Sequence, residues 1–88
     1  MSDQFDKLRE QLAQDEWPGI YMFKFIVPNK SDLTARVSAL FNDSADLHFQ
    51  PSKTGKYISV SGKELMMDIE SIIDRYKKAG EIEGLIAL

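Results

Sequence analysis

Apolar residues recur along the chain in two different spacings, and these spacings predict its elements. One apolar residue every three or four positions indicates an amphipathic helix, whereas strict alternation indicates a strand with one buried face. The helical spacing occurs in residues 1–14, 31–41 and 65–79. The apolar stripes of these three predicted helices are Phe5, Leu8 and Leu12; Leu33, Val37, Leu40 and Phe41; and Met66, Ile69, Ile72, Ile73 and Tyr76.

The remaining apolar segments are predicted strands. Residues 20–27 form the clearest one, because they are mostly β-branched or aromatic. Residues 45–50 and 56–63 alternate and are joined by a hairpin loop at 51–55, and residues 82–88 form a last strand. The alternation places these side chains toward the core: Leu47 and Phe49, with His48 outward; Ile58 and Val60; and Ile82, Ile86 and Leu88.

Short polar residues, proline and glycine mark where the helices begin and end. Ser2 or Asp3 is expected to cap the first helix, and Asn29 or Ser31 the second. Pro18 and Gly19 separate the first helix from the first strand, with Trp17 predicted to close the end of the core. Gly80 suits the left-handed position that commonly follows a helix.

The order of these elements is one helix followed by β-α-β-β-α-β. This pattern predicts an α+β, ferredoxin-like fold with a four-stranded antiparallel sheet and an extra N-terminal helix. We expect residues 1–16 to form that helix and residues 17–88 to form the domain, with its first and third strands in the centre of the sheet.

Such a sheet has helices on one face only. If Tyr21, Phe23, Phe25 and Val27 face the helices, the opposite face is rich in apolar side chains, and a contiguous exposed patch of that kind marks an interface. Three occupants of this face remain open: the N-terminal helix, a second copy of the chain, or a different protein or ligand. The residues expected on this face are Ile20, Met22, Ile26, Tyr57, Ser59, Ser61, Leu85 and Ala87.

Composition and charge exclude several classes of function. The 88 residues suit one small domain, and 11 basic against 14 acidic residues argue against a nucleic-acid binder. The chain has no cysteine, which excludes disulfides and thiolate chemistry, and no apolar run long enough to span a bilayer. Residues 1–16 are polar and acidic, unlike a signal peptide, so the expected location is the cytoplasm.

No group of residues has the spacing of a catalytic, cofactor-binding or metal site. His48 is the only histidine, the chain has no cysteine to join it as a ligand, and no acidic residue stands at a spacing that indicates a metal or catalytic site. The lysine-bearing loop around Lys53 lacks the P-loop spacing and joins two strands, so it reads either as a soluble hairpin tip or as a weak contact for an anion or partner. The carboxylates at Asp68, Glu70, Asp74, Glu81 and Glu83 are expected to be solvated.

Residues 51–61 carry a more specific signal. They resemble the motif Pro-Ser-x-x-Gly-x-Tyr-x-Ser-Val-Ser of the YbeD-like family, small bacterial proteins of unknown function, and the resemblance extends over residues 20–88. It implies an ACT-like version of the ferredoxin-like fold, but no catalytic or ligand residues. The matching residues are Pro51, Ser52, Gly55, Tyr57, Ser59, Val60 and Ser61.

These observations predict a non-enzymatic regulatory or protein-interaction module without a cofactor, whose partner is another protein or a second copy. The alternative is an ACT-like domain that binds a small metabolite. Neither a nucleic acid nor a membrane is expected as a partner. The predicted interaction surface consists of Pro51, Ser52, Lys53, Gly55, Tyr57, Ser59 and Ser61.

Overall fold

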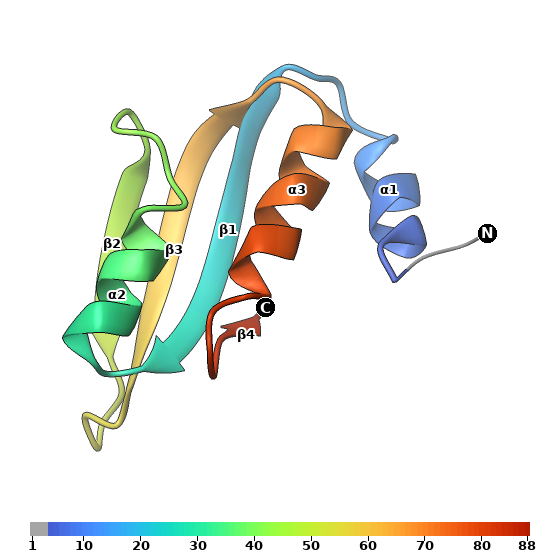
Figure 1. The fold of residues 1–88 in the computed structure, drawn as a ribbon. Helices are drawn as coiled ribbons and strands as arrows, with labels where there is room; N and C mark the ends of the chain where they lie inside the picture. Colours follow the sequence, from blue (N-terminus) through green and yellow to red (C-terminus); the bar gives the residue numbers. More distant parts are fainter. Residues whose placement is uncertain (1–3) are drawn as a thin grey trace.

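The computed structural model describes residues 4–88, so the expected caps Ser2 and Asp3 lie outside the described residues. It is a small α+β domain with a four-stranded antiparallel sheet and three helices (Figure 1). The elements along the chain are α1 (Asp6–Leu12), β1 (Gly19–Pro28), α2 (Ser31–Ser38), β2 (Asp46–Pro51), β3 (Tyr57–Met66), α3 (Ile69–Ala79) and β4 (Ile86–Ala87).

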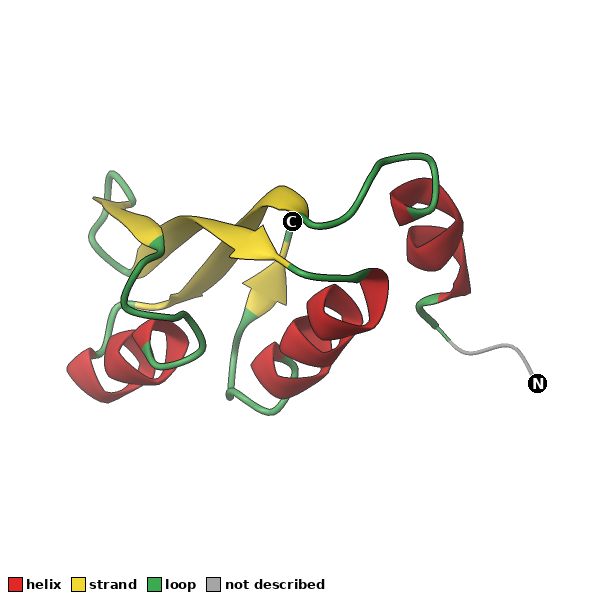
Figure 2. Ribbon diagram, turned by 90° about the horizontal axis from the view of Figure 1, so that it is seen from above, coloured by secondary structure: helices red, strands yellow, loops and turns green. Residues whose placement is uncertain are grey.

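The strands lie in the order β2-β3-β1-β4. β1 and β3 pair along ten residues each, from Gly19 opposite Met66 to Pro28 opposite Tyr57, whereas β4 pairs with β1 only at Phe25 and Ile26. α2 and α3 lie on one side of the sheet, and no described element covers the other side (Figure 2).

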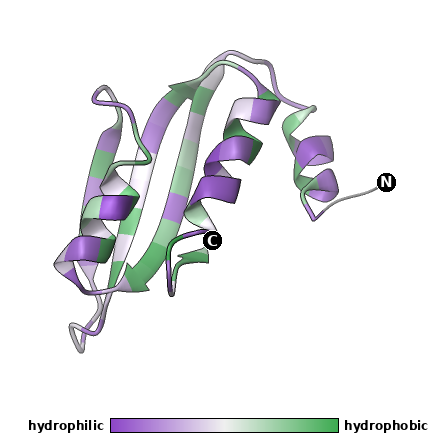
Figure 3. Ribbon diagram, viewed as in Figure 1, coloured by the Kyte–Doolittle hydropathy of each residue, from purple (hydrophilic) through white to green (hydrophobic). Residues whose placement is uncertain are grey.

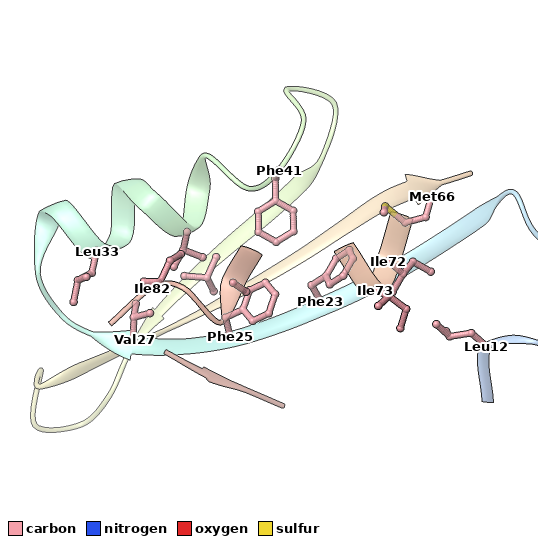
Figure 4. Packing of buried hydrophobic residues seen from close by; sticks show 13 residues of the cluster. Leu12, Phe23, Phe25, Val27, Leu33, Phe41, Met66, Ile72, Ile73 and Ile82 are labelled. Atoms are coloured by element: carbon pink, nitrogen blue, oxygen red, sulfur yellow. The ribbon is translucent and has the colours of Figure 1, made fainter. Parts of the chain in front are cut away.

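The core lies between the sheet and these two helices (Figure 4). Phe23, Phe25 and Val27 alternate along β1 and are fully buried, which confirms the side of this strand expected to face the helices. Val60 comes from β3, opposite Phe25. The helices complete the core with Leu33, Val37, Ile72, Ile73 and Ala79.

β3 is longer than the sequence predicts, and α3 begins later. Met66, expected in the helix, is the last residue of β3 and is buried. The reason is that the core-facing alternation continues from Val60 through Gly62 and Glu64 to Met66. α3 starts after Asp68, whose carboxylate accepts a hydrogen bond from the Ser71 amide at 2.8 Å.

The C-terminal segment also differs from the prediction. Gly80 has a φ of −63°, so it stays in the right-handed region, and the amide of the buried Ile82 donates to the Ala79 carbonyl in a continued turn. The chain reverses instead at Gly84, where φ is +76°. Only Ile86–Ala87 remain to form β4, and they are exposed.

The expected cap of α2 is wrong, and Phe49 on β2 points inward as predicted but is not fully buried. Neither Asn29 nor Ser31 caps α2, because the Asn29 side chain donates to the Gly55 carbonyl at 3.0 Å and Lys30 occupies the N-cap without a side-chain bond. Phe49 lies on the helix side of β2 but is 43% exposed. β2 is an edge strand, so one flank of this ring has no neighbour.

α1 does not cover the free face of the sheet; it lies beside α3 (Figure 1). Leu12 is buried in the core, and the Arg9 guanidinium binds the Glu70 carboxylate through contacts of 2.9 and 3.1 Å. The Trp17 indole donates to the Leu12 carbonyl at 2.8 Å and packs against the core, so it closes this end as expected.

Candidate interaction surface

The pairing register defines which side chains point away from the helices. We call this side the open face. Along each strand its side chains alternate with those that face the core. Across the strands its members lie opposite one another, as Lys24 does to Ser61 and Ser61 does to His48. Its members are Ile20, Met22, Lys24 and Ile26 on β1; Tyr57, Ser59, Ser61, Lys63 and Leu65 on β3; Asp46, His48 and Gln50 on β2; and Ile86 and Leu88 at β4.

The apolar members gather over β1 and its two neighbours, where Figure 3 shows hydrophobic residues along β1 and in β4. We call this set the apolar patch. Ile20 pairs with Leu65, and Ile26 pairs with Ile86. Ile20, Met22, Leu65, Ile86 and Leu88 are each between 51% and 66% exposed. Ile26 completes the patch and is half-buried.

The β4 residues on the open face differ from those that the sequence predicts. The sequence predicts Leu85 and Ala87 there, but Ala87 pairs with Phe25 on the core-facing register and Leu85 packs against the core. Ile86 and Leu88 take their place, since the Leu88 amide donates to the Lys24 carbonyl at 2.9 Å and continues the ladder.

The hydroxyl side chains of β3 separate the apolar patch from the polar edge strand β2. Tyr57, Ser59 and Ser61 lie on the open face, as the sequence predicts. Tyr57 is 48% exposed, whereas the two serines are half-buried. Hydroxyls both donate and accept hydrogen bonds, so this row offers polar contacts without charge.

Lys24 is the cation inside the apolar patch, a position that the sequence pattern alone does not establish. Met22 and Ile26 flank it along β1, and Leu88 lies beside it on β4. Within residues 4–88 no ion pair involves Lys24, whereas Lys63 lies opposite Asp46 in the register. The sequence does contain one part of the signal for this position, because Lys24 is the one charged residue among the apolar residues at every second position of β1.

The rest of the predicted surface forms the hairpin tip rather than the face. Ser52 organises the turn, because its amide donates to the Tyr57 carbonyl at 2.9 Å and its Oγ accepts from the Tyr57 amide at 3.2 Å. Gly55 adopts a φ of +74°, which favours glycine. Pro51 and Lys53 are exposed beside them. The first part of the motif at residues 51–61 therefore forms the hairpin turn, and its second part places hydroxyl side chains on the open face.

No catalytic arrangement forms around the other candidate residues. His48 Nε2 lies 3.4 Å from Asp46 Oδ1, but both side chains are about 70% exposed on the edge strand. In the part of the chain that the structure describes, no three His, Asp or Glu side chains are grouped as metal ligands.

A buried ionic cluster lies on the opposite, helix-covered side. Glu64 is 4% exposed and binds the Arg75 guanidinium through contacts of 3.1 and 2.8 Å. The amide and side chain of Asn42 also donate to it, at 3.1 and 2.9 Å. Burial raises the pKa of Glu64, but the hydrogen bonds from Arg75 and Asn42 and the Arg75 charge outweigh burial and lower the pKa overall.

Between α2 and α3 lies an open cavity of about 580 Å³. It is lined by Leu40 and Asn42 from the segment after α2, by Met66 at the end of β3, and by Ser71 and Arg75 from α3. The cations in its wall already have partners, because Arg75 binds Glu64 and Lys78 binds Asp74 at 3.0 Å.

Comparison with known proteins gives a likeness in fold. No protein-family model matches the chain, and no curated protein is significantly similar to it. The chain is similar to the structure of the uncharacterized protein TM1266 from Thermotoga maritima, with 18% sequence identity and a TM-score of 0.65. The match covers 78% of this chain and 90% of that one. Within residues 4–88, no helix is long and apolar enough to cross a membrane.

Proposed function

We propose that this protein is a non-enzymatic interaction module of the bacterial cytoplasm that binds another protein through the open face. The observation that carries this proposal is the apolar patch, in which five large apolar side chains are more than half exposed on one face. A soluble domain rarely leaves a contiguous apolar surface uncovered unless it is used in binding.

The division of the sheet into two faces supports the same proposal. The fully buried side chains that come from the sheet, Phe23, Phe25, Val27 and Val60, all lie on the helix-covered face. Met22 and Ile86 are therefore not needed to complete the core. Their exposure suits a contact with a second molecule, to which the β3 hydroxyls would add hydrogen bonds.

We also propose that the fold is ferredoxin-like of the ACT-like type and that the chain is a member of the YbeD-like family. The sheet order and the helices on one face support the first part, and the motif at residues 51–61 supports the second. A regulatory role rests on this fold analogy alone.

The test is affinity capture from a bacterial lysate with the intact protein and two variants. A partner recovered by the wild type should be lost with Met22→Ser combined with Ile86→Ser. It should be retained with Met67→Ser, which changes another exposed methionine in the β3–α3 connection. Equal recovery by all three proteins, or no specific recovery in repeated experiments, would overturn the proposal.

The cavity between α2 and α3 favours a second candidate function, binding of a small metabolite. Its volume of about 580 Å³ is in the range of ligand pockets. A thermal-shift screen against amino acids, nucleotides and common cofactors tests it. A ligand present at 100 times its Kd should stabilise the fold by about 2.7 kcal/mol, and an unchanged melting temperature across the screen would argue against this function.

A further inference from the structure

The open face carries more basic than acidic side chains, although the whole chain is acidic. Its charged side chains are Lys24 and Lys63 against Asp46, whereas the net charge of the chain is −3. Asp46 Oδ1 lies 3.4 Å from His48 Nε2 on the polar edge strand, and Lys63 lies opposite Asp46, so the charge inside the apolar patch is the one on Lys24.

Lys24 lies at the centre of the apolar patch. Ile20, Met22 and Leu65 lie toward one end of β1, and Ile26, Ile86 and Leu88 lie toward the other end or beside it. A partner that covers both groups must also cover Lys24. A buried ammonium group without a counter-charge is costly, so the partner has to bring an anion to this point.

From these positions we infer that the occupant of the open face is an acidic amphipathic helix of another protein, lying along β1 with a carboxylate at Lys24. The inference rests on the proposed function and specifies the partner's chemistry. Apolar side chains of the helix would contact the two groups of the patch, and the carboxylate would contact Lys24 between them.

The dimensions of the patch suit a single helix. From Ile20 to Ile26 the strand rises six residues, or about 20 Å at ~3.4 Å per residue. A helix of about 13 residues has the same length at ~1.5 Å per residue. The helix is ~10 Å wide and strands are ~4.8 Å apart, so it would cover β1 and its two neighbouring strands.

A second copy of the chain fits this face less well. Two copies stacked patch on patch, with the twofold axis at the centre of the patch, bring the same central residue of each copy together. Here that residue is Lys24, which would face the Lys24 of the other copy. Like charges brought together in this way oppose association.

The test uses two synthetic peptides of 16 residues that share leucines at helical spacing. One carries glutamate at the polar positions, and the other carries lysine. Binding of each peptide to the intact protein is measured by fluorescence anisotropy at low and moderate salt. The proteins are the wild type, Lys24→Glu, and the control Lys77→Glu, which makes the same charge change on an exposed residue of α3.

The wild type should bind the glutamate peptide at least about 10-fold more tightly than the lysine peptide, because the desolvated charge pair forms only with glutamate. Lys24→Glu should reverse this preference, and Lys77→Glu should leave it within about twofold. Chemical-shift changes of the backbone amides should map to β1 and β4 rather than to α3.

Equal binding of both peptides, or no binding of the glutamate peptide at millimolar concentration, would overturn the inference. So would a concentration-dependent dimer that Met22→Ser dissociates, since the occupant would then be a second copy. If the peptides fail while lysate capture still depends on Met22 and Ile86, the proposed function stands and only the acidic helix is wrong.

Discussion

Replacing Glu64 by glutamine should destabilise the fold far more than any other single change of a carboxylate. The Glu64 side chain is 2% exposed, and that of Arg75 is 11% exposed. All the groups that contact its two oxygens are donors, from Arg75 and from the amide and side chain of Asn42. The introduced amide group would place a donor against these donors and leave the Arg75 charge uncompensated.

The magnitude follows from the burial of this pair. Removing one partner of a buried ion pair costs about 3–5 kcal/mol, because the other charge stays desolvated. At ~0.05–0.15 kcal/mol per residue, a chain of this length has a free energy of unfolding of roughly 4–13 kcal/mol. Glu64→Gln should therefore remove a large fraction of it and lower the Tm by roughly 12–40 °C, at ~4–8 °C per kcal/mol.

The assay is urea unfolding followed by far-ultraviolet circular dichroism, with Asp74→Asn as the control. Asp74 pairs with Lys78 at 3.0 Å, but both side chains are about 60% exposed. Such a pair contributes about 0.3–0.5 kcal/mol. A loss of less than about 1 kcal/mol in Glu64→Gln, similar to that of Asp74→Asn, would refute the assignment of Glu64 as a buried charged partner of Arg75.

The same carboxylate should give the fold a dependence on acid pH. The pKa of Glu64 is lower in the folded protein than its ordinary value of 4.5. Its contribution to stability is therefore complete above pH 4.5 and is lost as the pH falls through the lowered pKa. Between these limits, the difference in unfolding free energy between the wild type and Glu64→Gln should shrink as acid is added, which urea titrations at several pH values would measure.

Two further predictions concern the same side of the sheet. Gly62→Ala should destabilise by about 1–3 kcal/mol, because the added carbon would overlap the Phe41 ring and lie 2.8 Å from Leu47 Cδ2; urea unfolding at unchanged stability would contradict this. Burial, with the Tyr21 hydroxyl 2.8 Å away, raises the pKa of Tyr76. The protein should therefore lose stability above about pH 10, where the unfolded chain ionises, and Tyr76→Phe should reduce that alkaline loss in thermal melts.

The sequence predicts most of the architecture because β1 carries a strong signal. Phe23, Phe25 and Val27 alternate with a second set that includes Met22, and this alternation defines both faces of the sheet. The same alternation predicts the position of the β3 hydroxyl side chains. Because β3 pairs with β1, they lie on the same face as the second set of β1 residues.

The boundary between β3 and α3 could not be predicted in the same way. Glu64 occupies a core-facing position, and a charged residue there hides the alternation that identifies a strand. It is tolerated because Arg75, eleven positions later, and Asn42, on the other side in sequence, reach it in space. No spacing rule links such residues before the fold is known.

The sequence also could not predict which face of the sheet each β4 residue occupies. Residues 82–88 have apolar side chains in both alternations, so either set could face the core. The reversal at Gly84 decides between them, because it places Ala87 opposite Phe25 and sends Ile86 outward. Lys24 can be recognised as a charge inside an apolar patch only after the fold places Leu88 beside it.

The unequal lengths of the strand pairings have a consequence for motion. The ten-residue pairing of β1 with β3 forms the centre of the sheet beneath the core, so its amide hydrogens should exchange only when the whole domain opens. The two-residue pairing of β4 is exposed and can detach alone at a much lower cost. Its detachment would carry Ile86 and Leu88 away from Lys24 while the remaining sheet stays folded. Hydrogen exchange at the Leu88 amide would then report how often one half of the patch is withdrawn.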